Sequence, residues 1–256
     1  MVRFYSTDYS YDYGFSAVSL AYFLRYPNPY SRHVASTDTI DRHFDPVTQR
    51  LTTVRLHLKK SRLPSAVLKV IPKSSVGASS DGSTQSFILE TSLVDVKEGW
   101  METESRNIDW SNVLSVIEKQ TYRRPALRNA TAEEIEAFKR DGTVRAADED
   151  RTDVSVSVTL KSRIGEQLRK RRQRWGDQAT ATSVMGSGEE EPVKQGWFSS
   201  WSSSAIRSAV ESISLQRTEK SQPKAKLGMS VVLDRLRHGG IQEVLEGMRN
   251  DRELDV

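Results

Sequence analysis

The sequence predicts an α+β fold, with an antiparallel sheet first and helices at the C-terminal end. Two observations predict it. Short segments up to about residue 161 alternate apolar and polar side chains with a period of two, which is typical of antiparallel strands with one wet face. Beyond about residue 200, apolar side chains recur at helical spacing instead.

Composition indicates one packed domain with polar additions. Hydrophobic residues make up 36% of the 256 residues and charged residues 28%, less apolar than an ordinary globular domain. We expect a single domain over 1–240, with insertions at about 123–150 and 165–200, and a tail over 241–256. The net charge of +4 is too small to indicate a polyanionic partner by itself.

Several kinds of site are excluded or disfavoured. The chain has no cysteine, which excludes disulfides, thiolate metal sites and a cysteine nucleophile, and its four histidines are scattered. We therefore expect no metal and no cofactor. No apolar run approaches the ~20 residues that span a bilayer. The N-terminus lacks the basic and apolar regions of a secretory signal, so we expect none, and its Asp8 and Asp12 argue against a transit peptide.

The first elements are a strand and a helix. The tyrosine-rich stretch 5–13 suits a strand, and Phe15, Val18 and Tyr22 then recur at helical spacing until Pro27. The prolines in 26–30 predict a rigid corner, because each fixes its own φ and restricts its predecessor.

Further strands follow along the chain. Residues 51–60 place Val54, Leu56 and Leu58 on one face and Thr53, Arg55, His57 and Lys59 on the other. Residues 87–94 are apolar on both faces, which indicates a more buried strand. Further strands are expected near 101–108 and 113–122, and the alternation over 154–161 is the clearest.

The remainder is charged loops and helices. We expect an inserted helix over 131–140, a basic run at 169–174 and a flexible loop at about 176–195. One helical stripe contains Ile206, Val210 and Ile213, a second contains Leu227, Val231 and Leu236, and a short amphipathic segment follows Gly240. Pro223 is expected to kink or break the helix between the two stripes.

Four motifs carry a resemblance to a known family. Arg25–Ser31 reads RYPNPYS and continues to His33, Val34 and Asp38. LTTVRL at 51–56 with KKS and LP, ESRNID at 104–109 and KLGM at 226–229 follow in the expected order. Together they resemble the PRELI-like family of lipid-transfer proteins, and RYPNPYS resembles its phosphatidic-acid branch more than its phosphatidylserine branch.

The resemblance implies a fold, a function, a cellular location and a protein partner. The fold is a helix-grip, related to START and phosphatidylinositol-transfer domains, in which about seven curved antiparallel strands wrap a long C-terminal helix around a lipid tunnel. The function is transfer of phosphatidic acid between the mitochondrial membranes for cardiolipin synthesis, with phosphatidylserine transfer as the alternative. Family members work in the intermembrane space as heterodimers with a small helical twin cysteine–nine–cysteine adaptor.

A phosphate headgroup needs convergent cations, because a phosphate monoester carries about −1.5 to −2 charges at neutral pH. The positions that match the family are Arg25, His33, Arg55, Lys59, Lys60, Arg217 and Lys224. A solvated surface charge is the alternative for each of them. The sequence leaves open whether the Arg55 face of its strand lines the tunnel.

Membrane contact is expected at a lid that contains Leu63, Val67, Leu68, Val70 and Ile71. It lacks the tryptophan usual in the family, and a loop packed on the core is the alternative. Trp197, Phe198 and Trp201 suit either a membrane interface or a core. The basic run at 169–174 suits an anionic membrane surface, a solvated face or a nuclear-localisation signal.

Three rival functions stay in view. An enzyme is disfavoured because GxSxG, HExxH and GxxxxGK[S/T] are all absent. A nucleic-acid-binding module rests on the basic run alone, and we expect no nucleic-acid partner. A lipid-binding adaptor or scaffold without transport is the third.

Overall fold

The structure is a computed structural model, and it describes residues 2–62, 83–111, 113–125, 151–163 and 203–253. Seven antiparallel strands form one sheet in the order β1-β7-β6-β5-β4-β3-β2. The strands are β1 (Val2–Tyr11), β2 (Val34–Asp45), β3 (Arg50–Arg62), β4 (Ser83–Asp95), β5 (Trp100–Asn107), β6 (Leu114–Arg123) and β7 (Thr152–Ser162). The helices described are α1 (Phe15–Leu24) and α7 (Ser203–Glu253).

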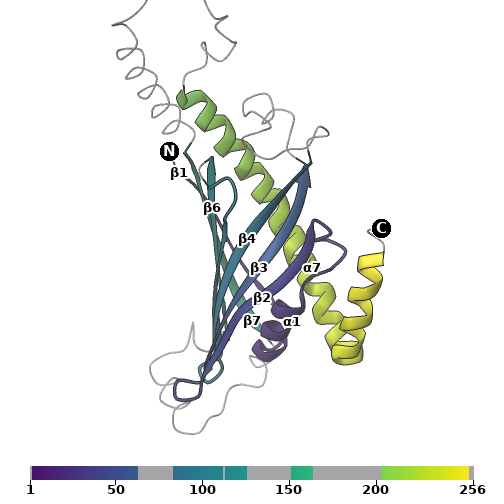
Figure 1. The fold of residues 1–256 in the computed structure, drawn as a ribbon. Helices are drawn as coiled ribbons and strands as arrows, with labels where there is room; N and C mark the ends of the chain where they lie inside the picture. The colour runs from purple at the N-terminus through teal and green to yellow at the C-terminus, as the bar shows by residue number, and fades with distance from the viewer. Residues whose placement is uncertain (1, 63–82, 112, 126–150, 164–202, 254–256) are drawn as a thin grey trace, which may run out of the picture.

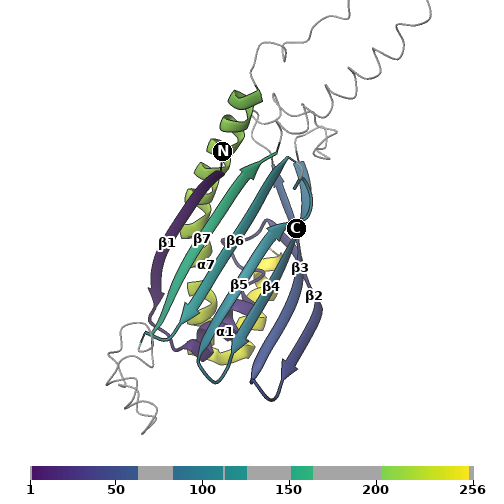
Figure 2. The same ribbon diagram turned by 90° about the vertical axis from the view of Figure 1, so that its left-hand side faces the viewer.

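Both helices lie on one face of the sheet, which we call the inner face. Figure 2 shows α1 and α7 behind the sheet, with no described element in front of it. In Figure 1 the long α7 runs obliquely along the strands, and α1 packs against its lower half. This sheet wrapped on a long C-terminal helix confirms the predicted helix-grip fold.

Side-chain alternation explains most of the strands. In β7 the four apolar side chains Val154, Val156, Val158 and Leu160 are at most 2% exposed, as their period of two predicted. The residue pattern did not identify β2. This strand forms an edge of the sheet and most of its side chains are exposed, so it has no apolar face to produce an alternation.

The hydrophobic core lies where α1 and α7 meet the strands. Val18 and Tyr22 of α1 are fully buried against Tyr122 of β6 and Leu233 of α7. The rings of Tyr22 and Tyr122 pack edge to face with centroids 5.5 Å apart. This core holds the C-terminal end of α1, and with it the start of the RYPNPYS motif, against the sheet.

Pro223 does not break α7, so the expectation of a break there was wrong. The backbone is helical through Pro223, and the non-helical residue is Gly240, with φ 64° and ψ −153°. That combination is open almost only to glycine. After Gly240 the helix turns back, and Val244 is fully buried while Arg235 donates to Asp251 at 2.7 Å.

The second apolar stripe of α7 was only partly correct, because Leu236 packs against the core but Leu227 does not. Leu227 is 48% exposed, whereas Met229, Val232 and Leu233 are buried against the core. Both sets satisfy helical spacing in this sequence, and packing against the core decides between them. The first stripe is supported by Val210, which is buried.

The inner face is polar along its middle, which the sequence did not predict for β4. Glu90 and Ser92 are each 1% exposed on the inner face, while Phe87 on the outer face is 42% exposed. Strand β4 is therefore not buried on both faces, and that interpretation of residues 87–94 was wrong.

Some expectations fall on residues that the structure does not describe. They are the lid residues Leu63, Val67, Leu68, Val70 and Ile71, the helix at 131–140, the basic run, and Trp197, Phe198 and Trp201. Within the described residues, no helix combines the length and apolar character needed to cross a bilayer.

Candidate functional site

Glu90 of β4 is the centre of a buried polar cluster on the inner face. Arg55 Nη2 lies 2.5 Å from Oε1 of Glu90, and Arg25 Nη2 lies 2.5 Å from Oε2. His57 Nε2 is 3.2 Å from Oε2 as well. The antiparallel register sets Arg55 directly opposite Glu90, and α1 delivers Arg25 from above the sheet.

The Arg55 side chain links the sheet to the end of α1 by hydrogen bonds. Its Nη1 donates to the carbonyl oxygen of Phe23 at 3.0 Å, its Nε donates to Glu90 at 2.8 Å, and its side chain is only 3% exposed. A cation at the C-terminal end of a helix is favourable because the last carbonyls have no partner within the helix. The Arg55 face therefore looks inward, and its charge is engaged with protein groups.

Arg25 is more accessible, with a side chain that is 14% exposed. It stacks on the Tyr22 ring at 3.7 Å and on the Tyr26 ring at 4.7 Å from the guanidinium carbon to each centroid. Its Nη1 donates to the carbonyl oxygen of Tyr22 at 3.1 Å. These contacts fix the plane of the guanidinium group.

Asn28 folds the RYPNPYS motif locally. Its Nδ2 donates to the carbonyl oxygen of Arg25 at 2.5 Å, and its Oδ1 accepts from the backbone N–H of Tyr30 at 2.9 Å. Gly228 of α7 approaches so closely that an added Cβ would lie 2.6 Å from Asn28 Oδ1. The first and last motifs of the chain therefore meet, and the glycine of KLGM is needed for that contact.

The cluster carries a net positive charge. Burial opposes ionisation of Glu90, but Arg25, a hydrogen bond from His57, and Arg55 hold its pKa well below the ordinary value. Burial also opposes the charge of Arg25, yet Glu90 raises the pKa of that guanidinium well above its ordinary value. Burial lowers the pKa of His57 despite the nearby Glu90, so this ring is neutral near pH 7. Two arginines thus face one carboxylate.

His33, just before β2, lies within electrostatic range of three further cations. Burial, followed by the positive charges of Lys59, Arg217 and Lys224, lowers the pKa of His33 to about 4. Arg217 also donates to the carbonyl oxygen of Arg62 at 3.2 Å, which brings α7 to the end of β3. Three cations predicted for the headgroup, from β3 and α7, therefore act on the predicted His33 through their charge.

Lys60 does not join this group. Side chains alternate along β3, and the buried Thr53, Arg55 and His57 put Lys59 on the inner face and the exposed Lys60 on the outer face. Lys60 is therefore the one predicted headgroup residue that the structure separates from the others.

Tyr26 lies within electrostatic range of both Arg25 and Lys59. Burial raises the pKa of its phenol, but Arg25 and Lys59 outweigh burial and leave the pKa below its ordinary value. Its ring packs edge to face on His57, with centroids 5.4 Å apart. Sequence reasoning missed Tyr26, His57 and Glu90 as site residues. The signal available was Glu90, a lone charge in the otherwise uncharged stretch 83–94.

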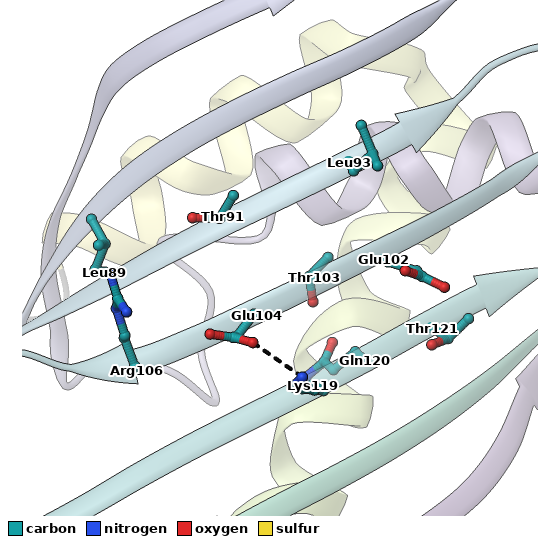
Figure 3. Close-up of a pocket in the computed structure, with 10 residues that line it drawn as sticks. All are labelled: Leu89, Thr91, Leu93, Glu102, Thr103, Glu104, Arg106, Lys119, Gln120 and Thr121. Carbon is teal, nitrogen blue, oxygen red and sulfur yellow. Dashed lines mark ion pairs between the residues drawn. The ribbon is translucent and has the colours of Figure 1, made fainter.

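A cavity of about 510 Å³ lies elsewhere, on the outer face of β4, β5 and β6. Figure 3 shows Leu89 and Leu93 on one side and the ion pair of Glu104 and Lys119 on the other. The predicted headgroup cations are not part of its lining. Within the described residues, no group of three acidic or histidine side chains is placed to hold a metal ion.

Comparison with known proteins identifies the family. Residues 16–172 match the model of the PRELI-like family. The chain is 35% identical to the mitochondrial protein UPS1 of Saccharomyces cerevisiae, over 51% of this chain and 69% of that protein. It is 39% identical to the ups1 homolog of Schizosaccharomyces pombe, over 40% of this chain and 54% of that protein.

Other similarities are weaker. PRELI domain-containing protein 1, mitochondrial, of Homo sapiens is 32% identical over 41% of this chain and 44% of that protein. The chain thus spans about half the length of some relatives. Among solved structures it is similar to the Zhui aromatase/cyclase of a Streptomyces species, with 9% identity and a TM-score of 0.43 over 94% of this chain and all of that one. The chain belongs to the PRELI-like family, the lipid-transfer family that its motifs resemble.

Proposed function

We propose that this protein carries phosphatidic acid between the outer and inner mitochondrial membranes and so supplies cardiolipin synthesis. One observation carries the proposal. Lys59, Arg217 and Lys224 lie close enough to His33 to lower its pKa together, and Lys59 also lowers the pKa of Tyr26, whose ring packs on Arg25. Neighbouring cations repel one another, and a bound anion would offset this repulsion.

The energetics of the cargo explain why a carrier is needed. Two acyl chains with about thirty methylenes expose apolar surface worth roughly 25 kcal/mol on leaving a bilayer, at ~0.8 kcal/mol per methylene. An apolar interior that replaces water lowers this barrier. We propose that the acyl chains lie between the inner face and α7, beside Val116 of β6 and Leu215 of α7, which pack against the core.

The cation count favours phosphatidic acid over phosphatidylserine. A phosphate monoester approaches two negative charges, whereas the phosphodiester of phosphatidylserine carries one and adds an ammonium group. Lys59, Arg217 and Lys224 attract the first and repel that ammonium. We therefore expect selectivity for the monoester.

We propose that the protein works in the intermembrane space with a small twin cysteine–nine–cysteine helical adaptor. Relatives from yeast and human are named mitochondrial, which supports the organelle. The outer face supports a protein partner, because no described element covers it and Phe87 is 42% exposed there beside the cavity lined by Leu89 and Leu93. Exposed apolar surface of this kind marks interaction sites.

A vesicle-to-vesicle assay tests the proposal. Donor vesicles of phosphatidylcholine contain labelled phosphatidic acid or labelled phosphatidylserine, and the full chain is added with its adaptor. We expect faster transfer of phosphatidic acid, and a fall of at least tenfold in Lys224→Glu and in Arg25→Glu. Lys97→Glu, at an exposed position in the turn between β4 and β5, is the control.

The outcomes separate the alternatives. Preference for phosphatidylserine would replace the proposed cargo, and binding without transfer would indicate a lipid-dependent scaffold. Conversion of the lipid into a new chemical species would indicate an enzyme. Equal transfer by Lys224→Glu and Lys97→Glu would remove Lys224 from the headgroup site.

A further inference from the structure

We propose that the chain's own residues 126–150 occupy the cavity on the outer face, through the helix that the sequence predicts over 131–140. These residues join β6 to β7 and lie outside the described part of the chain. The inference goes beyond the proposed function and is independent of the cargo. A protein partner that used this cavity would have to displace the segment.

The floor of the cavity is apolar and open to solvent. Leu89 and Leu93 of β4 line it, and both are only partly buried. The antiparallel register sets Leu56 opposite Leu89 and Leu58 opposite Phe87, so the apolar surface continues onto β3. Among the described elements, none covers this surface, because α1 and α7 both lie on the inner face (Figure 2). Contiguous exposed apolar surface of this kind indicates that something packs on it.

The opposite wall of the cavity is charged. Glu104 Oε2 lies 3.3 Å from Lys119 Nζ, in an ion pair that joins β5 to β6 (Figure 3). Glu102 and Arg106 of β5 also line this wall. An apolar floor beside charges of both signs fits a helix with one apolar side and mixed charges beside it.

Residues 131–140, which read TAEEIEAFKR, have this pattern. Ile135 and Phe138 are three residues apart and so share one side of the expected helix. Glu134 and Lys139, one charge of each sign, stand next to them in the sequence. A ten-residue helix is marginal by itself in water, so this one needs a surface on which to bury its apolar side.

The connection to β6 brings the segment to the cavity. Thr121 and Glu102 line the cavity and lie opposite each other, two residues before β6 ends at Arg123. That separation is about 7 Å along the strand. Residues 124–130 can extend over about 25 Å, which is enough to set the expected helix beside Leu93. The other long segments outside the described residues, 63–82 and 164–202, leave the sheet at its opposite end, where β3 and β7 end.

The experiment uses the absence of cysteine from the chain. Phe138→Cys is combined with Thr91→Cys, an exposed position in the cavity, and the full chain is oxidised mildly. The control pair is Phe138→Cys with Ser6→Cys. Register places Ser6 in the same row of the outer face as Thr91, four strands away, and both positions are two strands from β6. A segment that is tethered but not docked therefore reaches both positions about equally.

We expect the Thr91 pair to form an intramolecular disulfide roughly tenfold faster than the Ser6 pair, because a disulfide needs Cα atoms within about 7 Å. Equal rates would overturn the inference. A disulfide between two chains as the main product would also overturn it, because a second copy would then occupy the cavity.

Amide hydrogen exchange over 131–140 is a second measurement, and it needs no cysteine. We expect Leu93→Asp to speed this exchange by roughly fivefold or more, because a carboxylate makes the cavity floor polar. Val96→Asp, at a position that is 55% exposed in the turn after β4, is the control and should leave the exchange unchanged. Exchange in β7 shows that each variant is folded. Unprotected amides over 131–140 in the parent chain would overturn the inference, and so would protection that depends on added adaptor.

Discussion

Arg25 and Glu90, which are 65 residues apart in the sequence, form an ion pair with Nη2 2.5 Å from Oε2 at the inner face of the sheet. Glu90 is 1% exposed, so its charge depends on Arg25 and Arg55 for compensation. The first residue of the RYPNPYS motif is therefore both a candidate ligand and a part of the framework.

Glu90→Gln should lower the free energy of unfolding by about 3–5 kcal/mol, because it leaves two buried guanidinium groups without their counter-charge. Urea unfolding of the parent and the variant measures this. The matched control is Glu102→Gln, whose partner Arg123 and own side chain are both more than half exposed, and which should cost at most about 1 kcal/mol. Equal losses in the two variants would contradict a buried network.

The stability of the protein should depend on pH through His33. Its pKa in the folded protein is lowered to about 4, below its ordinary value, so the unfolded chain binds more protons between about pH 4 and 6.5. The free energy of unfolding should therefore rise as pH rises through this window. His33→Asn should flatten that part of the curve measured by urea unfolding, and a curve as steep as that of the parent would show that His33 is not near these cations.

Pro223→Ala should stabilise the protein, by up to about 3 kcal/mol. Proline inside a helix lacks one hydrogen-bond donor and crowds the preceding turn, and Pro223 is exposed, so little packing is lost with it. Urea unfolding would show the gain. A loss of stability would mean that the proline shapes α7 in a way that the fold requires.

Gly228→Ala should destabilise the protein by about 1 kcal/mol, although alanine is the better helix former. The new methyl group would overlap Asn28 Oδ1 at 2.6 Å, and Asn28 is held by its own hydrogen bonds. Thermal unfolding measures the effect, with Ser221→Ala at an exposed position of α7 as the control. Stabilisation by Gly228→Ala would contradict the close contact between the first and last motifs.

The fold was predictable where burial leaves a period in the sequence. Strand β7 shows this, because Val154, Val156, Val158 and Leu160 all face the core. Strand β2 left no such trace because both of its faces meet water along much of its length. In α7, Leu227 and Met229 are both compatible with helical spacing, and only tertiary packing selects Met229.

The motif positions named the candidate cations but not their arrangement. His33, Lys59, Arg217 and Lys224 lie within electrostatic range of one another, and their role in headgroup binding stays a prediction. Register and strand direction, which composition does not contain, separate Lys60 from Lys59 and place Glu90 opposite Arg55. The lipid tunnel remains a prediction, and the headgroup assignments remain tied to it.

The most direct test of the central claim is the identity of the lipid that co-purifies with the full chain and its adaptor, determined by native mass spectrometry followed by lipid extraction. We predict one phospholipid per protein, enriched in phosphatidic acid, and loss of that lipid in Lys224→Glu but not in Lys97→Glu. A protein that binds no lipid, or that retains the same lipid in both variants, would contradict the account.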